Sequence, residues 1–133
     1  MSTITLDEAV RMITAGIARA QEMGIRVSVA VLDPRGDLIA QHRMDGALWR
    51  SVPIAQGKAA ASAAWNISSK ELEARWESPV VRAFAMMENG RLIPGQGALP
   101  VRRADGTLAG AIGVSGAKPP EDEAVAQAGL EAL

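Results

Sequence analysis

The sequence predicts an α+β protein in which an antiparallel sheet of about five strands is flanked by helices. Three observations support this fold class. Apolar residues recur at helical spacing near the N-terminus, two later apolar runs are each split by a tight-turn signal, and an alanine-rich segment separates those runs. The expected order of helix, hairpin, helices, hairpin and helix favours antiparallel strand pairs.

The first helix is expected over Leu6–Met23. Thr5 and Glu8 have the spacing of a capping box, in which a hydroxyl and a carboxylate satisfy free amides at a helix start. From Leu6 onward an apolar residue recurs every three or four positions, which gives the helix one hydrophobic stripe. Gly24 is expected to end it.

A hairpin should follow. Residues 25–32 alternate valine with other side chains, which is the period-2 pattern of a strand. Asp33-Pro34-Arg35-Gly36 fits a type I turn, with Asp first, Pro second and Gly last. Residues 37–44 form the second expected strand, and Asp45-Gly46 ends it.

Alanine is the best helix former, so residues 51–65 are expected to be helical. Within them Gly57 is a local weakness that would let another segment approach the backbone closely. Residues 80–87 fit either a helix or an irregular segment. The other expected elements are a short helix from Ser68 to about Glu77, a short edge strand at Leu92-Ile93, a glycine-rich loop over 94–100, a second hairpin of 101–103 and 107–115, and a last helix over 121–133.

The composition excludes several classes of function. The 133 residues are expected to form one domain, residues 1–133, with a formal net charge of −1 and scattered Lys and Arg. Without a basic face or stacking aromatics, a nucleic-acid partner is not expected. The chain has no cysteine, no visible signal peptide and no apolar stretch that could cross a bilayer. A cytoplasmic protein without membrane association is therefore the default expectation.

Opposite charges stand at the end of the second expected strand. Arg43 and Asp45 are two residues apart, so strand alternation places both on one face. They form either a local ion pair that holds the strand end or part of a ligand site. In a ligand site, the planar fork of Arg43 suits a carboxylate, and Asp45 can act as a base.

Lys58 is a lone cation among the alanines of the expected helix 51–65. On a helix that packs against a sheet, such a cation is partly desolvated, which suits acid–base or Schiff-base chemistry. The alternative is an exposed lysine on the polar side of the helix.

Four stretches are typical of one family. They are the run from Val29 to Lys58, the glycine-rich Gly95–Val101, the run from Gly110 to Gly116, and the acidic opening of the last helix at Glu121-Asp122-Glu123. Together they resemble the GlcG/HbpS-like haem-binding family, whose domain also forms the C-terminal part of PduO-type cobalamin adenosyltransferases. The resemblance implies a profilin-like fold, a five-stranded antiparallel sheet in α/β/α layers, assembled into dimers or larger homo-oligomers.

The resemblance also implies a small-molecule binding protein, with haem or a related tetrapyrrole as the suggested ligand. The expected pocket joins the strand end, with His42 and Arg43, to Lys58 and to Gly95 and Gly97 of the loop. His42 is the only histidine and the first candidate for a metal ligand, because haem iron can take a single axial imidazole. A lone histidine on a half-exposed strand is, however, more often a surface or hydrogen-bonding residue.

Two further features bear on that ligand. Met44 is the methionine nearest the motif and an alternative axial ligand, although methionine more often fills apolar space. Family members usually read Gly-Gly-x-Pro in the loop, whereas this chain has Gly97-Ala98-Leu99-Pro100. Alanine at the second position narrows the backbone angles that the loop can adopt near a ligand.

An enzyme is the alternative to a binding protein. A cofactor-free lyase, isomerase or decarboxylase acting on a small carboxylate or carbonyl compound would use Arg43 to hold the acid and Asp45 or Lys58 as the base. The Lys58→Met variant would then lose turnover but keep its fold. A third hypothesis, a module that serves only for oligomerisation, predicts no occupied pocket.

Overall fold

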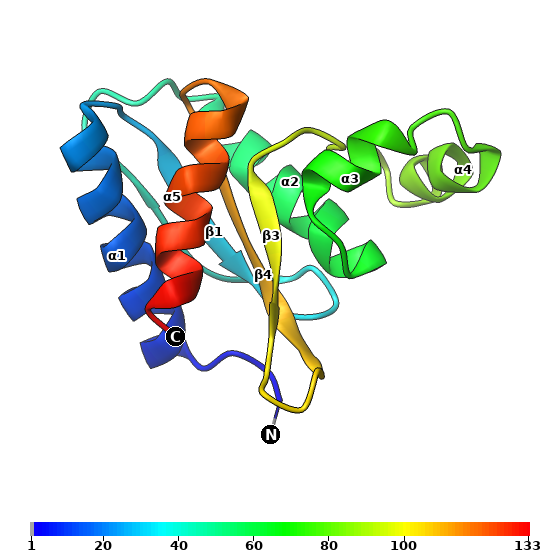
Figure 1. The fold of residues 1–133 in the computed structure, drawn as a ribbon. Helices are drawn as coiled ribbons and strands as arrows, with labels where there is room; N and C mark the ends of the chain where they lie inside the picture. Colours follow the sequence, from blue (N-terminus) through cyan, green and yellow to red (C-terminus); the bar gives the residue numbers. More distant parts are fainter. Residues whose placement is uncertain (1) are drawn as a thin grey trace.

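The computed structural model describes residues 2–133 and shows an antiparallel sheet flanked by helices (Figure 1). The sheet has four strands in the order β2-β1-β4-β3, so both predicted hairpins are present and β1 and β4 lie at its centre. The elements are α1 (Leu6–Met23), β1 (Ser28–Leu32), β2 (Leu38–Arg43), α2 (Ser51–Trp65), α3 (Ser69–Ala74), α4 (Pro79–Met87), β3 (Ala98–Arg102), β4 (Leu108–Ser115) and α5 (Pro119–Glu131).

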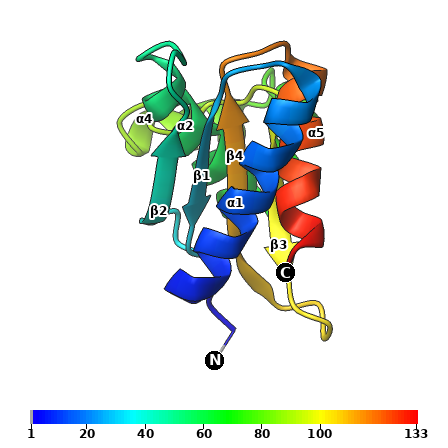
Figure 2. The same ribbon diagram turned by 90° about the vertical axis from the view of Figure 1, so that its left-hand side faces the viewer.

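Helices cover both faces of this sheet. α1 and α5 lie side by side on one face, and α2 crosses the other face (Figures 1 and 2). Each face has its own core: Val29 and Val31 of β1 pack toward α1 and α5, whereas Ala30 and Leu32 pack toward α2. The period-2 alternation of β1 therefore serves two apolar layers, which explains why all five of its residues are buried.

The predicted first helix is confirmed with its bounds and both ends. Thr5 Oγ1 accepts a hydrogen bond from the Glu8 amide at 3.1 Å, and Glu8 Oε1 accepts one from the Thr5 amide at 2.9 Å. Gly24 ends α1 in the left-handed conformation, with φ +69°. No helix within residues 2–133 is long and apolar enough to cross a membrane.

The prediction of a fifth strand at Leu92-Ile93 is wrong. The Ile93 amide donates to the Gly57 carbonyl of α2 at 3.0 Å, so this segment is bonded to a helix and adds no strand to the sheet. A Cβ on Gly57 would lie 2.6 Å from Ile93 Cδ1. The close approach expected at Gly57 is thus made by Ile93.

The segment that the sequence left open, residues 80–87, belongs to a helix. Pro79 occupies the first turn of α4, where its missing amide hydrogen costs nothing. Phe84 packs edge-on against Trp65 of α2, with ring centroids 6.1 Å apart. α4 otherwise lies at the periphery of the molecule (Figure 1), with Val80, Met86 and Met87 exposed.

One ion pair ties the N-terminus to the second hairpin. Arg103 Nη1 and Nη2 donate to the two carboxylate oxygens of Glu8 at 2.7 and 2.8 Å. Arg103 also donates to the carbonyls of Ser2 at 2.8 Å and Thr3 at 3.0 Å. Hydrogen bonds from Arg103, then from Thr5, lower the pKa of Glu8 from 4.5 to about 2.

This lowered pKa predicts a stability contribution that depends on pH. Between about pH 4.5 and about pH 2 the unfolded chain binds more protons at Glu8 than the folded chain. The contribution of the Glu8–Arg103 pair to the free energy of unfolding is therefore complete above about pH 4.5, and it is lost as the pH falls through about 2. Urea unfolding of the Glu8→Gln variant should show a deficit against the natural chain that shrinks over this range.

Glu22 provides the matched control, because its pair with Arg19 is long at 3.9 Å and exposed. Glu22→Gln should change the unfolding midpoint little at any pH, as surface pairs contribute little. If the stability deficit of Glu8→Gln stays constant down to about pH 2, the ionised Glu8 carboxylate is not the source of the stabilisation.

Candidate functional site

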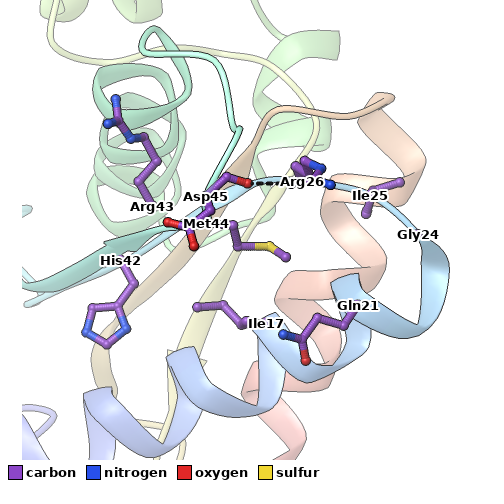
Figure 3. A pocket seen from close by; sticks show the side chains of 9 residues that line it. All are labelled: Ile17, Gln21, Gly24, Ile25, Arg26, His42, Arg43, Met44 and Asp45. Carbon is purple, nitrogen blue, oxygen red and sulfur yellow. Dashed lines mark hydrogen bonds between the residues drawn. The ribbon is translucent and has the colours of Figure 1, made fainter.

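Strand β2 turns alternate side chains toward opposite faces of the sheet. His42 pairs with Val29, whose side chain lies in the core beneath α1, so His42 points toward α1. Arg43 pairs with Ser28 and is directed to the other face. Figure 3 shows His42 and Met44 on the side of Ile17 and Gln21, with Arg43 turned away from them.

These residues border a groove of about 610 Å³ between α1 and β2, which we call the α1–β2 groove. Its size is within the usual range for small-molecule sites. Apolar and polar side chains line it together (Figure 3). It is lined by Ile17, Gln21, Gly24, Ile25, Arg26, His42, Arg43, Met44 and Asp45.

The polar groups of the groove differ in how they are bonded. Arg26 Nη1 donates to the Asp45 carbonyl at 2.9 Å, which joins the connection before β1 to the loop after β2. The Met44 sulfur accepts the Val27 amide hydrogen at 3.4 Å. The exposed His42 imidazole has no hydrogen-bond partner among residues 2–133. The His42 imidazole is thus available to a ligand.

The sequence left open whether Arg43 and Asp45 form an ion pair. The ion pairs found among residues 2–133 include neither residue. Both are exposed and both line the groove. The structural alternative, a local ion pair that holds the strand end, is therefore not what the structure shows.

Lys58 lies outside this groove, whereas the expected pocket joined it to His42 and Arg43. Its side chain leaves α2 and is buried, with Nζ donating to Asp122 Oδ2 and to the Val114 carbonyl, both at 3.1 Å. The other Asp122 oxygen accepts the Ala117 amide at 3.0 Å. These bonds direct the ammonium to the end of β4 and the start of α5.

The glycine-rich loop lies against Lys58, and Gly95 and Gly97, like Lys58, do not line the α1–β2 groove. A Cβ on Gly97 would lie 2.8 Å from Lys58 Nζ and 2.7 Å from the Val114 carbonyl, and its φ is +141°. Gly95 approaches Lys58 Cε at an ordinary 3.8 Å. Ala98, which replaces the second glycine of the family pattern, is fully buried in β3 and its amide donates to Ser69 Oγ at 2.9 Å.

The electrostatics of the Lys58–Asp122 pair are set by burial. Asp122 is 1% exposed and Lys58 is 7% exposed. Burial raises the pKa of Asp122, while the neighbouring Lys58 ammonium acts in the opposite direction. The Lys58 ammonium is bonded to a carboxylate and a carbonyl, so it cross-links α2 to the end of β4 and to α5.

The family described as "Haem degrading protein HbpS-like" matches residues 4–131. The chain belongs to the HbpS-like family. The resemblance found in the sequence motifs is thereby confirmed.

Relatives in the HbpS-like family match over most of the chain. A double mutant of HbpS from Streptomyces reticuli is 32% identical and has a TM-score of 0.86, with 100% of this chain and 88% of that chain covered. A structure described as the PduOC:heme complex is 26% identical with a TM-score of 0.87, covering 98% of this chain and 95% of that one.

One relative is much longer. The corrinoid adenosyltransferase PduO of Salmonella typhimurium is 30% identical over 125 residues, which are 90% of this chain and 35% of that protein. The HbpS-like chain thus spans about a third of this relative's length.

Several residues of this HbpS-like site could not be found by sequence reasoning. Ile17 belongs to the hydrophobic stripe of the first helix, Gln21 lies outside that stripe, and Arg26 falls in the predicted strand of residues 25–32, so none of them stands out as a site residue. Asp122 was noticed for its place in the first turn of α5, but its partner Lys58 is 64 positions away. The position of Arg26 two residues after the Gly24 stop is the one signal that it lies in a loop.

Proposed function

We propose that this HbpS-like chain binds haem or a related tetrapyrrole in the α1–β2 groove, with His42 as the residue that holds the iron. The observation that carries the proposal is the exposed imidazole of His42, which has no hydrogen-bond partner among residues 2–133 and lines a groove together with Ile17, Ile25 and Met44. His42 would then hold the haem iron through an imidazole nitrogen, a ligand that haem iron accepts in proteins.

The residues present fit such a ligand. Ile17, Ile25 and Met44 provide apolar contact for a flat macrocycle, and the groove volume of about 610 Å³ suits a ligand of this size. Arg26 and Arg43 place cations at the rim, where carboxylate substituents would lie. The match to a haem complex in the same family supports the choice of ligand.

His42 is favoured over Met44 as the iron ligand. The Met44 sulfur is already the acceptor for the Val27 amide, so ligation would cost that bond. His42 would lose nothing of the kind. Because it is the only histidine, the chain supplies one imidazole to each groove.

The cofactor-free enzyme receives no comparable support. Its expected base, Lys58, is buried against Asp122 and lies outside the groove that Arg43 and Asp45 line. Self-association, which the family resemblance implies, remains part of the proposal. The exposed Leu6 and Val10 on α1 and Leu38 on β2 support it, and sedimentation velocity would test it.

Titration of the purified chain with hemin is the test. We expect a saturable Soret shift at one hemin per chain, and His42→Ala should weaken binding at least about tenfold, or 1.4 kcal/mol. Met44→Leu keeps the apolar contact and should retain the shift. Absorbance that rises linearly without saturation, or an unchanged affinity in His42→Ala, would overturn the proposal.

A further inference from the structure

We propose that Arg26 is the specificity-determining residue of the α1–β2 groove and that it recognises a carboxylate of the bound ligand. This inference rests on the proposed function, since it names the group by which that groove would select a tetrapyrrole acid. It concerns a residue that the sequence motifs did not single out.

The bonding of Arg26 leaves most of its donors free. The guanidinium has five N–H groups, and one of those on Nη1 donates to the Asp45 carbonyl at 2.9 Å. No other side-chain hydrogen bond of Arg26 is found among residues 2–133. No carboxylate of the described chain lies within ion-pair distance of it. A guanidinium held at one nitrogen is pre-oriented, and its free fork suits a carboxylate.

Arg26 lies where it would contact the end of the ligand that is remote from His42. Figure 3 shows His42 and Arg26 on opposite sides of Met44. Arg26 also borders a second groove of about 440 Å³, formed with the loops at Gly46 and Gly116. A ligand that extends from His42 past Met44 would therefore reach Arg26 where the two grooves adjoin. Arg43 is the less suitable cation, because it is turned away from His42.

The neighbouring backbone is adapted to this guanidinium. Gly46 has φ +81°, and a Cβ there would lie 2.9 Å from Arg26 Nη1 and 3.1 Å from Arg26 Cδ. Any side chain at this position would displace Arg26 from its bond to the loop. The sequence Asp45-Gly46 thus supplies both the carbonyl that holds Arg26 and the space that it occupies.

The test compares hemin with hemin dimethyl ester, in which both carboxylates are masked. We expect Arg26→Gln to weaken hemin binding about tenfold and to leave ester binding unchanged, because a charge-assisted bond to the carboxylate is lost. Gly46→Ala should give the same pattern by displacing the guanidinium.

Two matched variants exclude trivial causes. Arg75→Gln removes the same charge from an exposed position away from the groove and should bind both ligands normally. Gly90→Ala imposes similar backbone strain at φ +73°, but a Cβ there meets nothing within 4 Å.

The outcomes separate the two proposals. Equal losses for hemin and its ester in Arg26→Gln would show that Arg26 only holds the loop, which overturns the inference and leaves haem binding intact. Equal affinity of the natural chain for hemin and for hemin dimethyl ester would also overturn the inference, because no carboxylate would then be recognised. Failure of the natural chain to bind hemin at all would overturn the proposed function and, with it, this inference.

Discussion

Replacing Lys58 with methionine is expected to lower the free energy of unfolding by about 3–5 kcal/mol at neutral pH. The reason is that Asp122, only 1% exposed, would lose its counter-charge while its carboxylate stays buried. Urea unfolding followed by circular dichroism measures this loss. Lys70→Met, at an exposed position of α3, is the matched control and should stay within about 0.5 kcal/mol of the natural chain.

The loss in Lys58→Met should depend on pH. Burial raises the pKa of Asp122, and removal of the ammonium removes the opposing influence. An acid whose pKa is higher in the folded state binds more protons in the folded chain than in the unfolded chain. The free energy of unfolding therefore falls as the pH rises from the acid's pKa in the unfolded chain to its pKa in the folded chain. The deficit of Lys58→Met should therefore be smallest at acidic pH.

A double variant completes this prediction. Adding Asp122→Asn to Lys58→Met removes the unpaired charge and keeps an oxygen that can accept the Ala117 amide. Most of the lost stability should return, because replacing both members of a buried pair costs much less than breaking it. If the single variant is as stable as Lys70→Met at every pH, Lys58 does not have the structural role that we assign to it.

The sequence predicted the local elements better than the long-range contacts. The capping box at Thr5, the stop at Gly24 and the turn at Asp33 depend on residues a few positions apart, and all are present. The supposed strand at Leu92-Ile93 failed because its partner is the Gly57 carbonyl, and no local pattern identifies that bond. An apolar dipeptide of this length fits a strand or a helix-packed segment equally well.

In the candidate site, too, local geometry could be predicted from the sequence and long-range contacts could not. Alternation along β2 puts His42 and Arg43 on opposite faces, although the predicted pocket contained both. The partner of Lys58 depends on how α2, β4 and α5 meet, and the role of Arg26 depends on the approach of the loop after β2. Such contacts join residues that are 19 and 64 positions apart, and side-chain spacing carries no information about them.

Replacing Gly113 with alanine should be among the most damaging single changes in the chain. Gly113 lies in β4 where α2 crosses the sheet, and an added Cβ would collide with the Ala55 carbonyl and lie 2.8 Å from Ala59 Cβ. Both obstacles belong to the body of a helix, so they cannot move as the end of a flexible side chain can. We expect a loss of about 3 kcal/mol or more, at the upper end of the usual cost of overpacking.

Gly95→Ala is the control that separates collision from the general effect of adding a methyl group. Gly95 has no positive φ, and its added Cβ would make ordinary contacts at 3.8 Å with Lys58 and 3.9 Å with Ile93. Its unfolding midpoint should remain close to that of the natural chain, while that of Gly113→Ala falls sharply. Equal midpoints in the two variants would show that α2 can move away from β4, and the close helix–sheet contact at Gly113 would then not be a requirement of the fold.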